Sequence, residues 1–189
     1  MVNLEIRLAT EKDLDAIMKV EEEAWPIESR APVIKFKERL EVFPDGFFVA
    51  LLNKKVVGVT TSQKINYDPK NPPNSWTEIT SDGHISESHV PNGNAIYVVS
   101  LGVSPRARPG GKGIGVGTQL LEKQKKLVEQ LNLKYLVLSA RVPGYDFYCK
   151  KYGNINIEVY TKLKRADSQA EDMELRFYER AGLRQVKIC

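Results

Sequence analysis

The sequence predicts an α/β fold with a mixed sheet. Two apolar segments, residues 47–52 and 55–65, are joined through Asn53 and Lys54, which is typical of an antiparallel hairpin. Within residues 95–142 a strand, a glycine-rich turn, a helix and a second strand follow one another, and this order is that of a βαβ crossover with two parallel strands. With 189 residues, 42% of them apolar and 28% charged, the chain has the size and composition of one compact domain.

Capping residues predict the first elements. Residues 4–8 alternate like a short strand, and Thr10 with Asp13 forms a capping box that opens a helix. Pro32 suits the first turn of a second helix, in which Val33, Phe36 and Leu40 stand at the spacing of one inward face.

The remaining elements follow a long polar stretch. Residues 66–94 contain four prolines, both histidines and one tryptophan, and a loop of this length is usually a lid or a binding loop. Apolar runs and turn residues predict the segments that follow. These are a buried strand at 95–103, a helix at 118–131, a buried strand at 135–142, a polar insert at 143–171, a helix at 172–182 and the start of a strand at 183–189.

The charge is unevenly distributed along the chain. The net charge is +4, but residues 1–103 carry −4 and residues 104–189 carry +8. The basic half favours an anionic partner. No helix carries a one-sided stripe of Lys and Arg interleaved with aromatic residues, so we expect a small phosphorylated ligand and no nucleic acid.

Membrane and export signals are not readable in the sequence. The longest apolar run, residues 47–52, is too short to span a bilayer, and the N-terminus lacks the apolar core of a signal peptide. Cys149 and Cys189 are too few for a disulfide framework or a thiolate metal site. We therefore expect a cytoplasmic protein without a membrane partner and without a metal.

A glycine-rich turn carries the clearest chemical signal. Five glycines lie within residues 110–117, where backbone N–H groups and the positive end of the following helix can hold a pyrophosphate. A P-loop would need Gly in place of Arg106 and Ser or Thr in place of Gly113. No G-x-G-x-x-G register ends on a glycine, so both of these nucleotide motifs fail.

Residues 103–121 resemble the coenzyme signature of the GNAT superfamily of N-acetyltransferases, in which V-x-P precedes [Q/R]-x-x-G-x-[G/A] and a helix with Leu-Leu. Two registers fit: residues 108–113 counted from the strand, and residues 112–117 counted from the helix. We prefer the second, because the phosphate site is built from the helix N-terminus. Further segments are similar to other parts of the family, namely 45–62, 140–145 and 176–186.

The resemblance implies one N-acetyltransferase domain over residues 1–189, with the long loop 66–94 and the insert 143–171 inside it. The implied fold is a mixed, mostly antiparallel, twisted sheet with one splayed parallel strand pair and helices on both faces. The family's last strand is not found before residue 189, so we expect that either the chain is cut short or a neighbouring copy in a homodimer supplies that edge. The implied reaction is direct acetyl transfer from acetyl-CoA to a small-molecule or peptide amine.

The resemblance places acetyl-CoA against two backbone segments. The central strand would supply N–H groups to the oxyanion and to the pantetheine arm, with Gly102 permitting a bulge. The glycine turn and the helix start would hold the pyrophosphate. The expected coenzyme-binding residues are Leu101, Gly102, Val103, Arg108, Lys112, Gly113, Ile114, Gly115, Val116, Gly117 and Thr118.

Catalysis requires an acid and a base. The resemblance puts Tyr178 beside the thioester as general acid for the leaving thiolate. A primary amine with a pKa near 10.4 is almost fully protonated at neutral pH, so a base or a water chain is useful. Tyr97 holds the strand position where relatives often carry a base. The alternatives in the long loop are Glu78, Glu87, His84 and His89, acting through water.

Substrate contacts are expected from Arg141, Tyr145 and His89. Every one of the candidate side chains has an ordinary packing or surface role as its alternative. For the whole protein, the alternative function is a non-catalytic sensor of acyl-CoA or CoA.

Overall fold

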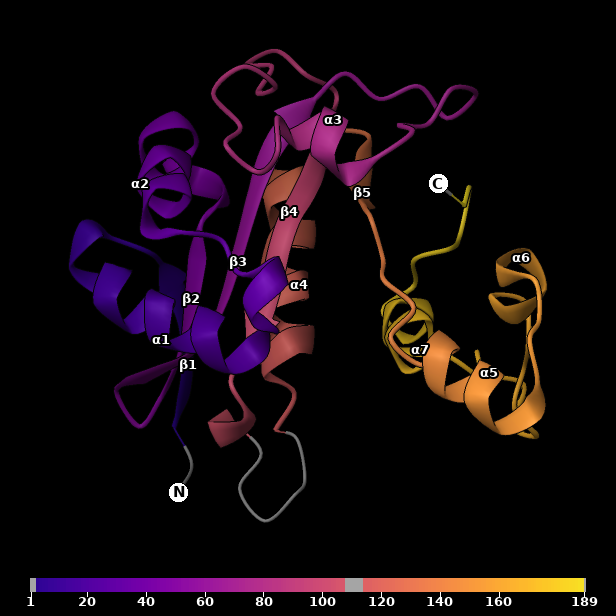
Figure 1. The fold of residues 1–189 in the computed structure, drawn as a ribbon. Helices are drawn as coiled ribbons and strands as arrows, with labels where there is room; N and C mark the ends of the chain where they lie inside the picture. Colours follow the sequence, from indigo (N-terminus) through magenta and orange to yellow (C-terminus); the bar gives the residue numbers. More distant parts are fainter. Residues whose placement is uncertain (1–2, 108–113, 189) are drawn as a thin grey trace. The chain divides into compact units, whose positions relative to one another are not determined.

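A computed structural model of the chain describes residues 3–107 and 114–188 (Figure 1). The chain forms two compact units, Met1–Leu138 and Ser139–Cys189. The first unit contains the sheet. A single functional domain over both units stays a prediction.

The first unit is built on a mixed five-stranded sheet in the order β1-β2-β3-β4-β5. Strands β1 to β4 pair in antiparallel fashion, whereas β4 and β5 are parallel, as the crossover prediction required. The strands are Leu4–Leu8 (β1), Phe48–Leu52 (β2), Lys55–Ile65 (β3), Ala95–Val103 (β4) and Tyr135–Leu138 (β5).

The hairpin between β2 and β3 has the tightest connection in this sheet. Its two turn residues, Asn53 and Lys54, have φ angles of 49° and 68°. Two positive φ angles in sequence are those of a type I′ turn, whose twist matches that of the flanking strands. Lys54 stands at the second turn position, where glycine is preferred.

Helices cover both faces of the sheet (Figure 1). Helices α1 (Leu14–Ala24) and α2 (Val33–Val42) lie on one face, and α4 (Val116–Gln130) lies behind the other. The capping box predicted between Thr10 and Asp13 is present. The long loop contains one short helix, α3 (Trp76–Thr80).

Two hydrophobic clusters fill the space between these layers. On one face, Ile17 and Val20 of α1 and Phe36 of α2 pack with sheet residues, and all three are fully buried. On the other face, Leu120 and Leu127 of α4 pack with side chains of every strand of the sheet. The sheet is therefore buried on both sides, which explains the apolar run that predicted β4.

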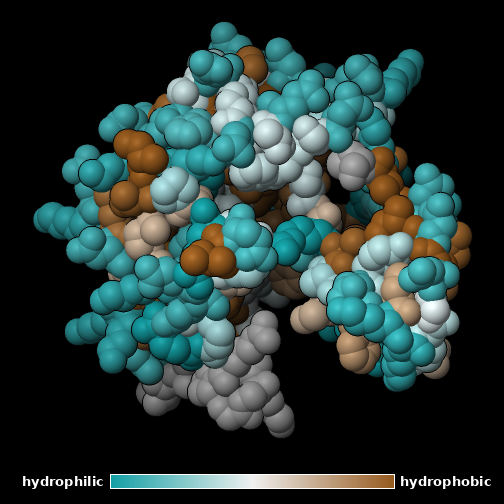
Figure 2. Space-filling view, in the orientation of Figure 1, coloured by the Kyte–Doolittle hydropathy of each residue, from teal (hydrophilic) through white to brown (hydrophobic). Residues whose placement is uncertain are grey.

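The exposed surface of α2 departs from the prediction. Val33, expected on the inward face, is 41% exposed, and its neighbour Ile34 is 56% exposed. Figure 2 shows a hydrophobic patch over this helix. Phe36, predicted at the same helical spacing, is buried as expected, and Arg39 is buried beside it.

Two strand predictions are corrected. The strand expected at 135–142 ends at Leu138, because its partner β4 pairs with it only from Ala95 to Val98. The start of a strand expected at 183–189 is wrong for the described residues 183–188, which form no strand.

The second unit is helical. It contains α5 (Tyr145–Tyr152), α6 (Ile157–Tyr160) and α7 (Met173–Arg180). Asp172 caps α7 by accepting a hydrogen bond from the Glu174 amide at 2.8 Å, and it also accepts one from the Tyr160 hydroxyl at 3.1 Å. The predicted cap Gly182 follows α7 with a φ of 82°.

Among the helices of residues 3–107 and 114–188, none combines the length and the apolar composition that crossing a bilayer requires.

The close approach of β3 to α4 predicts a stability effect at Gly58. A Cβ atom there would lie 2.8 Å from Val116 Cγ1 and 3.0 Å from Leu120 Cδ1. Gly58→Val should therefore lower the free energy of unfolding by roughly 1–3 kcal/mol through overpacking, with Gly58→Ala between it and the parent chain. Urea unfolding measures both. Equal unfolding midpoints for all three proteins would contradict this close packing.

Candidate active site

The edge of β4 offers unpaired backbone groups. Its parallel pairing with β5 ends at Val98 and Leu138, but β4 continues to Val103. Among the described residues, no strand pairs with the β5-side edge of β4 beyond Val98. Backbone N–H and C=O groups on such an edge bind an extended ligand as a further strand would.

A β-bulge marks the point where this edge opens. Thr61 pairs with Ser100 and Ser62 pairs with Val98, so Val99 is the extra residue of β4. The bulge expected at Gly102 thus lies at Val99, and Gly102 stays in register opposite Val59. Bulges occur often next to active sites, where they re-aim backbone groups.

The bulge is held by a side chain from the long loop. The indole Nε1 of Trp76 donates a hydrogen bond to the Val99 carbonyl oxygen at 2.8 Å. On the neighbouring strand, Thr60 Oγ1 donates to the Ser100 carbonyl at 2.9 Å. The carbonyl groups at the bulge therefore have partners, and its geometry is fixed by α3 and β3 together.

A buried arginine lies beside the bulge. Arg39 is 1% exposed, and its Nε donates to the Gly83 carbonyl at 2.8 Å. Its Nη1 lies 3.4 Å from Thr61 Oγ1 and 3.5 Å from Ser100 Oγ, which are long contacts. Its Nη2 has no partner among the described residues. Burial lowers the pKa of Arg39 to about 10, so the side chain remains charged at neutral pH.

Helix α2 fixes the second half of the long loop through further contacts. Lys35 Nζ lies 2.7 Å from Asp82 Oδ2, and Glu38 Oε2 lies 2.7 Å from His84 Nδ1. Glu38 also accepts a hydrogen bond from the Ser86 amide at 3.0 Å. Residues 81–86 are thereby attached to α2 over one face of that helix.

The N-terminus of α4 begins at Gly115, which has a φ of 76°. The first N–H groups of a helix lack intrahelical partners and favour an anion. The first turn of α4 contains no acidic residue that would oppose one. Val116, Gly117 and Thr118 stand at this end, with Ile114 before it. The predicted contacts Arg108, Lys112 and Gly113 lie outside the described residues.

The other predicted residues of β4 divide between the two faces. Tyr97 is 1% exposed and belongs to the cluster under α4, and Leu101 and Val103 pack against the same cluster. This burial favours a packing role for the Tyr97 ring. Gly102 faces α1, where an added Cβ would lie 3.1 Å from Trp25 Nε1.

The candidate residues of the long loop lie at different places in the structure. Glu78 is exposed on α3, close in sequence to Trp76, and Glu87 is exposed. His89 Nδ1 accepts a hydrogen bond from the amide of Lys64, which pairs with Ile96. Burial and the nearby Lys64 lower the pKa of His89. Ile96 lies within the part of β4 that pairs with β5, three residues or about 10 Å of strand before Val99, where the open edge begins.

The remaining candidates belong to the second unit. Tyr178 is half-buried on α7, and burial together with the charge of Glu174 raises its pKa. Tyr145 donates its hydroxyl hydrogen to the Ile155 carbonyl at 2.6 Å, so this group already has a structural partner. Arg141 is exposed, and its amide donates to Glu174 Oε1.

Two residues of the site were missed in the sequence. The single tryptophan of the polar loop, Trp76, was a visible signal, since a large aromatic side chain in such a loop needs a packing partner. Arg39 follows Phe36 at helical spacing on the inward face of α2, and that position was the available signal.

Within residues 3–107 and 114–188, no group of three or more His, Cys, Asp or Glu is placed to hold a metal ion.

The model of the acetyltransferase (GNAT) family matches residues 14–153. In sequence, the chain is 30% identical over 149 residues to the "Uncharacterized N-acetyltransferase YkwB" of Bacillus subtilis, covering 77% of this chain. It is 29% identical over 176 residues to an "N-alpha-acetyltransferase" of Sulfolobus acidocaldarius, covering 92% of this chain and 91% of that protein. The chain spans 64% of the length of YkwB, and 28% of the "Probable hydrolase YhcX" of Bacillus subtilis.

Solved structures show the same fold. The loading GNATL domain of CurA from Lyngbya majuscula has a TM-score of 0.79 at 20% identity, covering 95% of this chain and 84% of that one. The GphF GNAT-like decarboxylase, solved in complex with isobutyryl-CoA, has a TM-score of 0.75 at 25% identity, covering 93% and 83%.

Removing the hydrogen bond between Trp76 and the Val99 carbonyl should lower the stability of the protein. Trp76→Phe keeps an aromatic ring but leaves the Val99 carbonyl without its donor, which should lower the free energy of unfolding by roughly 1–3 kcal/mol. Urea unfolding measures this change. Thr77→Val, an exposed substitution on the same helix, is the control and should be nearly neutral. A loss no larger than that of the control would show that the indole does not hold the bulge.

Proposed function

Since the chain belongs to the GNAT acetyltransferase family, we propose that it binds acetyl-CoA and transfers the acetyl group to a primary amine. The acceptor is a small-molecule or peptide amine, and attack takes place directly in a ternary complex. The activity, the acceptor and any homodimer of the whole protein belong to this proposal.

One observation carries the proposal: the edge of β4 is unpaired beyond Val98 within the described chain. The pantetheine arm of a coenzyme carries amide groups that can pair with Leu101–Val103 as an extra strand, beyond the Val99 carbonyl that already accepts the Trp76 indole. The N-terminus of α4 supplies N–H groups and a positive field for the pyrophosphate. The complex of the GphF decarboxylase with isobutyryl-CoA supports the same class of ligand.

The chemistry follows from the thioester. The neutral amine attacks the carbonyl carbon, so that a C–N bond forms and the C–S bond breaks. A backbone N–H at the open edge would stabilise the oxyanion that develops on the carbonyl oxygen. The thiolate leaves with the electron pair of the C–S bond and takes up one proton. The amine gives up one proton to a base or a water chain.

Tyr178 is our proposed source of the proton for the thiolate. Burial and the charge of Glu174 raise the pKa of its phenol, so it keeps its proton at neutral and moderately alkaline pH. For the base, Glu78 is the candidate whose helix is anchored at the bulge through Trp76. A water chain ending on Glu78 would carry the amine's proton away from the site.

Assays distinguish two other functions from the proposed acetyl transfer. A non-catalytic sensor would bind acetyl-CoA without releasing CoA thiol when amines are added. A decarboxylase, suggested by the likeness to GphF, would release carbon dioxide from a carboxylated acyl-CoA in the absence of any amine. A panel of primary amines with thiol detection, run beside a carboxylated acyl-CoA alone, separates the three.

The helix start predicts an effect on coenzyme affinity. Gly117→Val puts a branched side chain beside the first free N–H groups of α4, which should weaken acetyl-CoA binding about tenfold or more by blocking approach of the pyrophosphate. Calorimetric titration measures the affinity. Gln130→Val at the other end of α4 is the matched control and should bind normally. Unchanged affinity in a folded Gly117→Val protein would remove this helix end from the binding site.

The proposed acid predicts a kinetic signature. Tyr178→Phe keeps the ring and removes the proton, so kcat should fall roughly 10- to 1000-fold while KM for acetyl-CoA changes little. Because the pKa of Tyr178 is raised, the parent enzyme should keep its acid to higher pH than an ordinary tyrosine allows. Steady-state kinetics across pH test both points. A kcat within twofold of the parent would leave the proton to water or to another group.

A further inference from the structure

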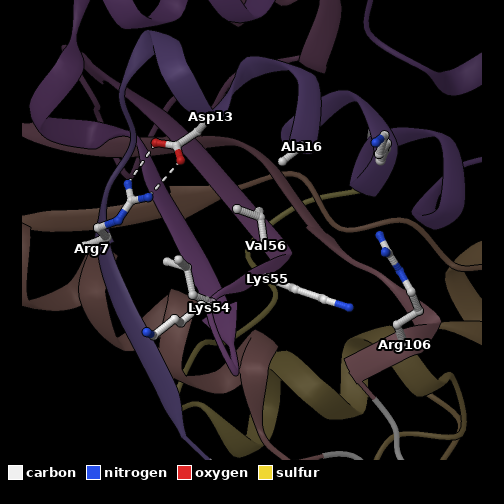
Figure 3. Close-up of a pocket in the computed structure, with 9 residues that line it drawn as sticks. Arg7, Asp13, Ala16, Lys54, Lys55, Val56 and Arg106 are labelled. Atoms are coloured by element: carbon white, nitrogen blue, oxygen red, sulfur yellow. Dashed lines mark hydrogen bonds and ion pairs between the residues drawn. The ribbon is translucent and has the colours of Figure 1, made fainter.

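A hollow lies on the first unit, on the face of the sheet that α1 covers. It has a volume of about 440 Å³ and is bordered by α1, by the β2–β3 hairpin and by the turn Pro105–Ala107 (Figure 3). A hollow of this size accommodates a nucleotide-sized molecule. We propose that it binds a phosphorylated ligand of the nucleoside polyphosphate class, distinct from the coenzyme of the proposed reaction.

The charge of the lining is strongly positive. Among the described residues that line the hollow, five are basic and Asp13 is the one acidic residue. Asp13 already forms a two-fold ion pair with Arg7, with distances of 2.7 and 2.8 Å, and this pair lowers the pKa of Asp13 to about 2. The basic residues are Arg7, Lys19, Lys54, Lys55 and Arg106.

Several of these basic side chains have charged groups that can still bind a ligand. In the described part of the chain, Lys19, Lys54 and Lys55 form no ion pair. Arg106 is held through Nε by Glu23 Oε2 at 2.9 Å, which leaves its two terminal nitrogens for a ligand. Figure 3 shows Lys55 and Arg106 pointing toward the same space. Lysine ammonium groups and a fixed guanidinium together suit phosphate oxygens.

The turn that carries Lys54 supports a binding role. Lys54 adopts a φ of 68° at a position where glycine is preferred. A backbone conformation that a side chain rarely adopts is tolerated where the side chain has a use. Lys54 lines the hollow from this turn.

The floor of the hollow is apolar. Ala16, Leu51 and Val56 line it between the basic residues. An apolar floor beside several cations suits a ligand with a flat organic body and a chain of phosphates. This combination favours a nucleoside polyphosphate over inorganic phosphate.

The hollow and the proposed coenzyme site use opposite faces of the sheet. Leu51 and Val56 pack against the cluster under α1, whereas Ile114 and Val116 belong to the cluster under α4. Acetyl-CoA bound at the N-terminus of α4 should therefore leave the hollow free. The proposal does not depend on the acetyltransferase reaction.

Calorimetric titration of the full chain with ATP and with tripolyphosphate tests the site. Both should bind, and ATP should bind several-fold more tightly because its base covers the apolar floor. Lys55→Ala should weaken both about tenfold, since one charged contact is lost. Lys37→Ala, an exposed lysine on α2, is the matched control and should change neither affinity.

Lys54→Gly gives a second, independent variant that will fold. It should raise the unfolding midpoint, because glycine suits the turn, while it weakens ATP binding. Saturating acetyl-CoA should leave ATP binding in place, and failure of acetyl-CoA to bind would count against the proposed function alone. Unchanged ATP affinity in Lys55→Ala, an equal loss in Lys37→Ala, equal affinities for ATP and tripolyphosphate, or full displacement of ATP by acetyl-CoA would each overturn this assignment.

Discussion

The early end of the pairing between β4 and β5 determines most of the candidate site. Because β5 stops at Leu138 while β4 runs on to Val103, the second half of a central strand keeps one edge unpaired within the described chain. An open edge inside a sheet would ordinarily be filled by another strand. Here it meets the N-terminus of α4, and the two features together suit a ligand with an extended amide arm and a phosphate end.

Two side-chain contacts fix the surroundings of this edge. Trp76 donates its indole N–H to the Val99 carbonyl at the bulge, and Arg39 donates to the carbonyl of the loop residue Gly83. The Trp76 bond holds the backbone of β4 where a reacting carbonyl would need a fixed donor, which is the condition for electrostatic catalysis at an oxyanion.

Local signals in the sequence predicted the fold well. The capping box at Thr10, the hairpin at Asn53 and the crossover around α4 depend on neighbouring residues, and the structure confirms all three. The bulge depends on pairing between distant strands, so its place at Val99 instead of Gly102 was not readable. The roles of Tyr178 and Glu78 stay predictions, because they depend on contacts with bound substrates.

The attachment of residues 81–86 to α2 has a consequence for how the molecule moves. Lys35, Glu38 and Arg39 occupy successive turns of one helix face, and each contacts this loop segment. A loop held in this way cannot open by itself, since the buried guanidinium of Arg39 would lose its strongest acceptor. The loop and the helix therefore form one cooperative unit, whose local unfolding and amide exchange are governed by the packing of α2 on the sheet.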